Sequence, residues 1–225
     1  MQLLVGHAVC RGRVDISVAC PDVVEDVAAE YATKGELEDL GILHVVARGI
    51  DTQLFHPERR SLNLRDNWGA TPQTIVLLSV GRLAAEKNLD LTIRTYQTLK
   101  AAGRSVQMIF AGDGPMRAAM QAKCPDAIFT GMCTHDELAS LYASADLLLF
   151  PSLTETFGNV TLEALASGTP VLAFDCAAAS DFIHDNQNGW LVSGEDATAY
   201  IDRALEITRD PSRLAGMRAY ARVSV

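Results

Sequence analysis

Two glutamates that could take part in chemistry, Glu155 and Glu163, lie eight positions apart in the segment PSLTETFGNVTLEALASGTP (151–170). On one continuous helix of about 3.6 residues per turn, this spacing would separate them by about 80° around the axis. A shared helical face therefore does not fully account for their spacing. The turn residues predict instead that Glu155 lies in a loop and that a helix begins near Asn159, a favourable N-cap residue. Unpaired amide groups at a helix start attract anions such as phosphate.

The first turn of this helix indicates what kind of ligand would fit. The backbone N–H groups of Val160 and Thr161 would point toward a bound phosphate. Glu163 would accept hydrogen bonds from hydroxyls beside that anion, and Glu155 would accept them from hydroxyls further out. A ligand that presents hydroxyls, then phosphates, then more hydroxyls is a nucleotide sugar.

Two cations follow the apolar run TIVLLSV (74–80): Arg82 and Lys87, in the segment GRLAAEKN. A diphosphate leaving group gains negative charge as its bond to a sugar breaks, and fixed cations stabilise that charge without a metal. The glycine turn GDGP is not accompanied by a DxD pair, and Asp113 and Asp146 are not grouped as a divalent ion requires. The sequence therefore predicts a metal-independent site.

The elements that would position these residues begin at about residue 74, where short apolar runs alternate with helical patterns. Strands are predicted at 74–80, 105–112, 126–131, 146–151 and 170–175, with a further candidate at 189–192. Helices are predicted at 88–103, 115–123, 134–145, 159–167 and 196–208, with Pro115 at a first helical position and a capping box at Thr134 and Glu137. This alternation indicates a doubly wound α/β domain with a parallel sheet, whose ligands bind beyond the carboxyl ends of the strands.

The first 65 residues have a different pattern. Residues 14–19 and 43–51 are strand-like, 22–32 are helical, and 56–69 are polar and rich in turn residues. One or two βα units do not bury both faces of a sheet by themselves. We therefore expect residues 1–65 to be a remnant of a preceding domain plus a connector, and residues 66–225 to be a nucleotide-sugar-binding domain. The chain also stops soon after a helical pattern, so we expect truncation at both ends.

Composition narrows the class of protein. The net charge of -9 argues against general nucleic-acid binding, and 48% hydrophobic residues can form a sizeable core. The five cysteines are scattered without metal-ligand spacing, which suits a reduced cytoplasmic interior. Apolar runs stay well short of the roughly 20 residues of a membrane span, and residues 1–9 lack the pattern of a signal peptide.

Five separated segments resemble the retaining glycosyltransferases of family 4, which have the two-domain GT-B fold. They are RGIDTQLFHP (48–57), VGRLAAEKNLD (80–90), FAGDGP (110–115), ASADLLLFPSLTETFGNVTLEALASGTPV (143–171) and NGWLV (188–192). The first is similar to the interdomain crossing of that family, and the other four are similar to its carboxy-terminal donor-binding domain. The segment TETFGNVTLEALASG most resembles enzymes that add mannose or sulfoquinovose to lipids or related acceptors.

The resemblance implies a role for each residue of the site. Arg82 and Lys87 would hold the donor diphosphate, and Glu155 would hold hydroxyls of the transferred sugar; these three are the predicted catalytic residues. Glu163 would hold the ribose hydroxyls. The full predicted donor-binding set is Gly131 and Met132 near the base, Phe157, Gly158 and Asn159 beside the sugar, and Gly81, Val160, Thr161 and Glu163.

The same resemblance implies the reaction and its partners. The donor would be a nucleoside-diphosphate sugar such as GDP-mannose or a UDP-sugar, the acceptor a lipid or saccharide, and no cofactor would be needed. Anomeric configuration would be retained by front-face attack, so a second carboxylate nucleophile is not required. The full-length enzyme would work in the cytoplasm, at the inner membrane surface. Most of the family's acceptor-binding domain is missing here, and His7 does not match its histidine, so this chain is expected to supply only the donor site.

Two other functions compete with this one. A nicotinamide-dependent dehydrogenase would need GxGxxG after a strand, but GRLAAE does not fit and GDGPMR has Arg117 where the third glycine belongs. The second alternative is a non-catalytic module that binds a nucleoside diphosphate without transferring a sugar.

Overall fold

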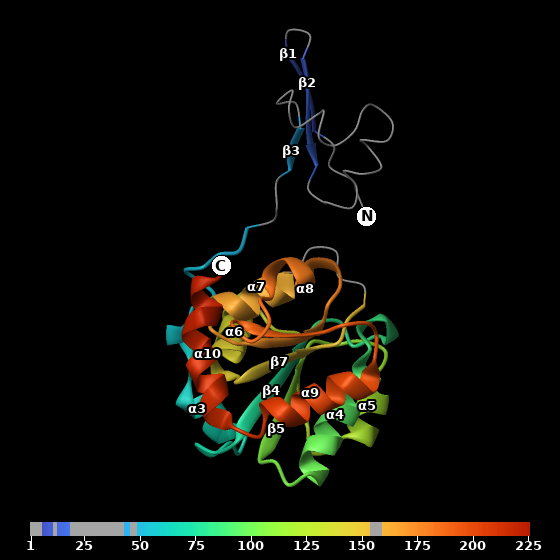
Figure 1. The fold of residues 1–225 in the computed structure, drawn as a ribbon, viewed down its shortest axis with the longest axis vertical. Coiled ribbons are helices and arrows are strands. Elements are labelled where there is room, and N and C mark those ends of the chain that lie inside the picture. The colour runs from blue at the N-terminus through green and yellow to red at the C-terminus, as the bar shows by residue number, and fades with distance from the viewer. Residues whose placement is uncertain (1–5, 11–12, 19–42, 46–48, 154–158) are drawn as a thin grey trace. The chain divides into compact units, whose positions relative to one another are not determined.

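The computed structural model describes residues 6–10, 13–18, 43–45, 49–153 and 159–225, which belong to two compact units, 1–49 and 50–225 (Figure 1). In the first unit, β1 (Gly6–Cys10) pairs antiparallel with β2 (Arg13–Val18), which pairs in parallel with β3 (Leu43–Val45). The strands predicted at 14–19 and 43–51 are thus confirmed in part, whereas β1 was not predicted. The helix predicted at 22–32 lies outside the described residues. The assignment of 1–65 to a preceding domain stays a prediction.

The second unit is built on a six-stranded parallel sheet in the order β6-β5-β4-β7-β8-β9. Its strands are β4 (Ile75–Val80), β5 (Val106–Ala111), β6 (Ile128–Gly131), β7 (Leu147–Phe150), β8 (Val171–Phe174) and β9 (Gly189–Val192). All five strands predicted for this part of the chain are confirmed, and the candidate at 189–192 is the sixth. The predicted doubly wound parallel sheet is therefore correct.

Helices cover both faces of this sheet (Figure 1). They are η1 (Pro57–Arg59), α3 (Leu62–Asn67), η2 (Ala85–Lys87), α4 (Leu89–Ala101), α5 (Arg117–Lys123), α6 (His135–Ser144), α7 (Asn159–Ala166), α8 (Ala177–Phe182), α9 (Ala197–Ile207) and α10 (Pro211–Val223). No helix in the described ranges has the length and apolar character needed to cross a bilayer.

The two faces of the sheet are buried by different helices because successive side chains of a strand point to opposite sides. Leu77 of β4 packs with residues of α4, α5 and α9, whereas its neighbour Val76 packs with residues of α6, α7 and α8. Both side chains are fully buried. The continuous apolar runs that predicted these strands are thus explained by burial on both faces.

The segment predicted as a connector, 56–69, contains helices and belongs to the second unit, where it packs on the body of the domain. Asp146, at the start of β7, accepts hydrogen bonds from Arg60 and Arg65, each at 2.8 Å. Arg218 of α10 donates to the carbonyl oxygens of Ala143 and Ala145 at the end of α6, each at 2.8 Å. Burial lowers the pKa of the Arg218 guanidinium to about 10. These contacts hold η1, α3 and α10 against the body of the domain.

One predicted boundary is wrong. The helix predicted to begin at Pro115 begins at Arg117, after Met116 as its N-cap. The amide of Met116 donates to the carbonyl oxygen of Leu83 at 3.0 Å. This hydrogen bond joins the turn before α5 to the loop after β4. The helix therefore begins two residues later than predicted.

Candidate functional site

Three glycines stand side by side at the carboxyl ends of β6, β5 and β4. The amide of Gly81 donates to the carbonyl oxygen of Ala111 at 3.0 Å, and the amide of Gly112 donates to that of Gly131 at 2.9 Å. Gly81 and Gly112 have φ values of 137° and 130°, which side chains rarely permit. A Cβ on Gly112 would also overlap the carbonyl group of Gly81. This edge of the sheet is therefore a floor of bare backbone, the glycine floor, in which Gly81 and Gly112 are half-buried and Gly131 is buried.

Lys87 lies where the strand order of the sheet reverses. The chain runs outward from β4 through β5 to β6, and then returns to place β7 on the other side of β4. A Cβ on Gly81 would lie 3.9 Å from Cε of Lys87, and the Lys87 ammonium lies 6.0 Å from the centroid of the Phe150 ring. The side chain therefore spans the ends of β4 and β7, the place where doubly wound sheets bind ligands.

Asn88, which the sequence analysis did not single out, holds this loop in place. It adopts the left-handed conformation with a φ of 51°, and its side-chain amide donates to the carbonyl oxygen of Pro151 at 3.2 Å. Asparagine is one of the few side chains that tolerate this conformation. The loop that carries Lys87 is thus tied to the residue that follows β7.

Arg82 belongs to the same loop but is much less constrained than Lys87. Its side chain is 70% exposed, and its guanidinium lies 4.0 Å from the Glu86 carboxylate. An exposed ion pair of this kind contributes at most about 1 kcal/mol, so the side chain can exchange Glu86 for another anion. The two predicted cations therefore differ. The Lys87 ammonium has a defined position at the end of the sheet, whereas the exposed Arg82 side chain can change its orientation.

Helix α7 is described from Asn159 to Ala166, and the residues before it, 154–158, lie outside the described residues. The first four amide groups of a helix have no partner within it, so the prediction that the amides of Val160 and Thr161 bind an anion requires a helix that starts at Asn159, and it stays a prediction. Thr161 and Ser152 are buried, and among the described residues their hydroxyl oxygens have no hydrogen-bond partner. Buried hydroxyls are usually bonded. These two hydroxyls, one just after β7 and one near the described start of α7, lie on either side of residues 154–158 in the chain.

Glu163, one turn into α7, is anchored to the neighbouring helix α6. The hydroxyl of Tyr142 donates to Oε2 of Glu163 at 2.9 Å. Tyr142 is fully buried, and its ring packs edge-to-face on Phe55 with 6.0 Å between the ring centroids. Tyr142 could not be recognised from the sequence, because a tyrosine in the pattern ELASLYASA is typical of an ordinary core position.

The predicted residues Glu155, Phe157 and Gly158 lie outside the described residues. Of the remaining predictions, the structure brings Gly81, Gly131 and Lys87 to one edge of the sheet. Glu163 is placed on the helix that follows β7. Elsewhere in the described ranges, we find no group of three or more metal-ligating side chains.

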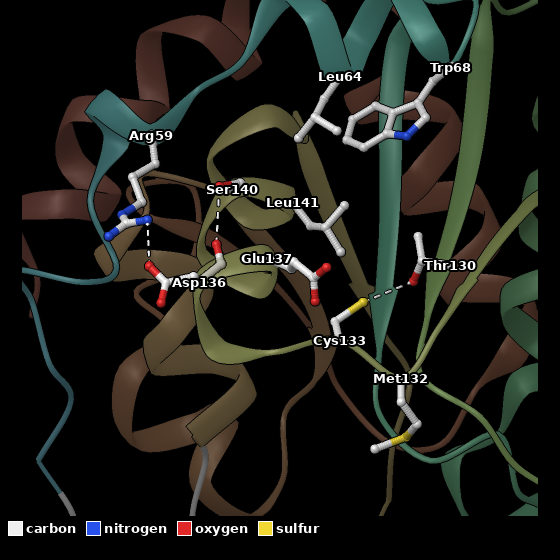
Figure 2. Close-up of a pocket in the computed structure, with 10 residues that line it drawn as sticks. All are labelled: Arg59, Leu64, Trp68, Thr130, Met132, Cys133, Asp136, Glu137, Ser140 and Leu141. Atoms are coloured by element: carbon white, nitrogen blue, oxygen red, sulfur yellow. Dashed lines mark hydrogen bonds and ion pairs between the residues drawn. The ribbon is translucent and has the colours of Figure 1, made fainter.

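Met132, which follows Gly131 at the carboxyl end of β6, lines a pocket of about 480 Å³. The pocket is lined by Arg59, Leu64, Trp68, Thr130, Met132, Cys133, Asp136, Glu137, Ser140 and Leu141. Figure 2 shows Leu64 and Trp68 at one end of it, Met132 at the other, and Leu141 between them. Met132 is 80% exposed, so it offers an apolar surface directly after the Gly131 turn.

A further cation, Arg117, borders the same turn. Its Nη1 lies 2.9 Å from Oδ2 of Asp113, and a Cβ on Gly131 would lie 3.2 Å from this nitrogen. The guanidinium therefore covers the backbone at the end of β6. From the sequence alone, Arg117 was notable only because it stands where a GxGxxG fingerprint would have its third glycine.

Together the parallel sheet, its glycine floor and the lysine at the strand-order reversal define a Rossmann-like domain of the class that binds nucleotides at its carboxyl edge. The profile of the family described as Glycosyl transferases group 1 matches residues 74–210, more than half of the chain. The chain belongs to this family, which confirms the family predicted from its motifs.

Curated relatives cover most of the chain. It is 38% identical over 189 residues to the GDP-mannose-dependent alpha-mannosyltransferase of Corynebacterium glutamicum, a match that spans 83% of this chain and 44% of that protein. It is 35% identical over 175 residues to a GDP-mannose-dependent alpha-(1-6)-phosphatidylinositol dimannoside mannosyltransferase of Mycobacterium tuberculosis, spanning 76% of this chain and 46% of that protein. The chain thus spans less than half the length of these two relatives.

A solved structure shares the fold. HepE from Anabaena, in complex with UDP and glucose, superposes with a TM-score of 0.73 at 18% identity, over 92% of this chain and 56% of that one. At this identity the likeness concerns the fold alone. It agrees with the predicted GT-B donor domain.

Proposed function

We propose that this chain binds the diphosphate of a nucleoside-diphosphate sugar at the carboxyl edge of β4 and β7, and that its protein transfers the sugar with retention to a lipid or saccharide acceptor. The observation that carries the proposal is the position of Lys87, whose ammonium lies 6.0 Å from the Phe150 ring, at the reversal of strand order. The family to which the chain belongs supports a transferase.

The diphosphate would lie between the β4–α4 loop and the start of α7. Lys87 supplies a positioned positive charge there, and Arg82 can leave Glu86 to supply a second one. The amides of Val160 and Thr161 and the buried hydroxyl of Thr161 complete a set of donors suited to phosphate oxygens. Such donors stabilise the charge that develops as the diphosphate departs, and a metal ion is then not required.

The hydroxyl-bearing parts of the donor would lie on either side of this diphosphate. Glu163 would accept hydrogen bonds from the ribose hydroxyls, since its carboxylate is held one turn into α7 by Tyr142. Glu155 would bind hydroxyls of the transferred sugar, with Phe157, Gly158 and Asn159 shaping that part of the site. In the chain, these residues come directly before or at the described beginning of α7.

The base would lie against Gly131 and Met132, with Gly81 leaving room for the nucleotide over the sheet. The partial exposure of Gly81 and Gly112 supports this placement, and the Arg117 guanidinium that covers Gly131 would border the base. The exposed Met132 side chain offers an apolar contact for a base. The relatives named as GDP-mannose-dependent make GDP-mannose the first donor to test, and the UDP in the HepE complex makes a UDP-sugar the second.

In the proposed reaction, the acceptor hydroxyl attacks the donor from the face that the diphosphate leaves. The departing phosphate oxygen takes the hydroxyl proton, so the anomeric configuration is kept without a carboxylate nucleophile. Arg82 and Lys87 stabilise the diphosphate as its bond to the sugar breaks. We place this reaction in the cytoplasm at the inner membrane surface, supported by the relative named for a phosphatidylinositol acceptor.

The test is transfer of labelled sugar from GDP-mannose, UDP-glucose and ADP-glucose, with the 225-residue chain and with a protein in which a complete amino-terminal domain precedes it. The proposal expects binding of one donor by the chain, transfer by the completed protein, and an α-linked product from an α-linked donor. Binding without transfer by the completed protein would identify a non-catalytic nucleotide-binding module. Binding of a nicotinamide dinucleotide but of no sugar nucleotide would contradict the proposal.

A further inference from the structure

The contact between Tyr142 and Glu163 joins two helices that follow neighbouring parts of the site. Tyr142 lies near the end of α6 and Glu163 lies in the middle of the described part of α7, and both helices cover the same face of the sheet. The hydroxyl-to-carboxylate distance is 2.9 Å, and Glu163 is half-buried. A fully buried side chain therefore reaches from the core to a carboxylate at the edge of the candidate site.

Tyr142 is a rigid donor. Its side chain is fully buried, and its ring packs on Phe55. Its backbone carbonyl accepts a hydrogen bond from the Thr169 hydroxyl at 2.6 Å. A buried aromatic ring held in this way has little rotational freedom, so the position of its hydroxyl is fixed by the core.

Glu163, by contrast, has a side chain with three rotatable bonds, and fixing such a side chain costs conformational entropy. A hydrogen bond donated to an ionised carboxylate is among the stronger hydrogen bonds in proteins. The Tyr142 hydroxyl therefore reduces the number of orientations that the carboxylate samples before any ligand binds. Preorganisation of this kind improves affinity because less freedom is lost on binding.

We propose that Tyr142 is a positioning residue for donor binding, which holds the Glu163 carboxylate in the orientation that accepts the ribose hydroxyls. This inference rests on the proposed function of the site. Tyr142 itself is buried, and its role is exerted through Glu163.

The test is Tyr142→Phe, which removes one oxygen atom and keeps the buried ring. Calorimetry on the 225-residue chain would compare GDP, UDP and ADP with their 2′,3′-dideoxy analogues. For the nucleotide that the parent chain binds, we expect Tyr142→Phe to weaken binding about tenfold, and to change binding of the dideoxy analogue less than about twofold. Glu163→Gln should lose the same discrimination, and the double variant should lose little more than either single one.

Tyr200→Phe is a matched control. Tyr200 is also fully buried, and its hydroxyl donates to the carbonyl oxygen of Leu172 at 2.8 Å in the cluster on the opposite face of the sheet. This variant loses one buried hydrogen bond, as Tyr142→Phe does, but it is remote from Glu163. It should lower the melting temperature by a similar amount and leave nucleotide binding unchanged.

The outcomes separate this inference from the function on which it rests. If the parent chain binds none of the nucleotides, the proposed function and this inference both fail. A second outcome would overturn only the positioning role. In it, the parent chain and Tyr142→Phe both bind the nucleotide more tightly than its dideoxy analogue, whereas Glu163→Gln binds the two equally. Equal weakening of nucleotide and dideoxy analogue by Tyr142→Phe would also overturn it, because a general structural loss would then suffice.

Discussion

The ammonium of Lys87 lies 6.0 Å from the centroid of the Phe150 ring, so a cation from the loop after β4 stands over the end of β7. These two strands are neighbours in the sheet, although β5 and β6 lie between them in the chain. The crevice between such strands is where doubly wound sheets bind their ligands. Lys87 is thus the described side chain on which the proposed diphosphate site most depends.

Replacing Lys87 by methionine should weaken binding of the nucleoside diphosphate by about 10- to 100-fold, because a charge-assisted hydrogen bond contributes about 1.5–3 kcal/mol. Calorimetry at fixed ionic strength would measure the change. Lys123→Met is the control: Lys123 is half-exposed and pairs with Asp90 at 2.6 Å on the surface. Equal affinities for the Lys87 variant and the parent would contradict the assignment.

Gly112→Ala should destabilise the fold by about 2 kcal/mol or more, because the new Cβ would overlap the Gly81 carbonyl at a φ of 130°. Urea unfolding would measure the loss. Gly216→Ala is the matched control, since Gly216 lies inside α10 and a Cβ there would meet no described atom within 4 Å beyond its own helix backbone and chain neighbours. It should stabilise the protein by about 0.5–1 kcal/mol. An unaltered urea midpoint for Gly112→Ala would count against the glycine floor.

Most of the fold of residues 74–208 could be predicted from the sequence, because its strands are buried on both faces. Continuous runs such as those in β4 and β8 show this directly. Helix α3 was missed because its segment is polar, and its stability depends on contacts distant in the chain. Arg65, for example, is buried because it reaches Asp146, 81 positions away, and the backbone carbonyl groups of Ser144 and Thr74. Local patterns carry no information on such pairs.

The Thr134 capping box should make the stability of α6 depend on pH. Hydrogen bonds from the Thr134 amide and then from its hydroxyl hold the pKa of Glu137 below the ordinary value of 4.5. A lowered carboxyl pKa contributes stability that is present above 4.5 and is lost as the pH falls through the pKa of the folded state. The difference in urea midpoint between the parent and Glu137→Gln should therefore be full near neutral pH and shrink below pH 4.5. A difference that stays constant well below that pH would contradict this.

Asp146→Ala should cost about 3–5 kcal/mol of unfolding free energy, because it leaves the buried Arg65 without its counter-charge. The side chains of Asp146 and Arg65 are 16% and 7% exposed. Asp136→Ala removes a pair of similar geometry, 2.9 Å from Arg59, but its carboxylate is 76% exposed. That control should cost less than about 1 kcal/mol. Similar losses for the two variants would show that Asp146 does not anchor η1 and α3.

The site was less predictable than the fold. Residue types and their order along the chain indicated which residues follow each strand, and the structure places Gly81, Gly131 and Lys87 at one edge. The partners of these residues could not be predicted, since Tyr142 and Asn88 act through contacts with Glu163 and Pro151 that no local pattern reveals. Side-chain orientation depends on packing between helices that are distant in sequence.

The central claim is tested most directly by a crystal structure of the 225-residue chain with bound GDP or UDP. The account predicts that the phosphates lie between the Lys87 ammonium and the first amides of α7, with the ribose hydroxyls on Glu163. A diphosphate bound at the amino ends of the strands, or one without contact to Lys87 and α7, would contradict it.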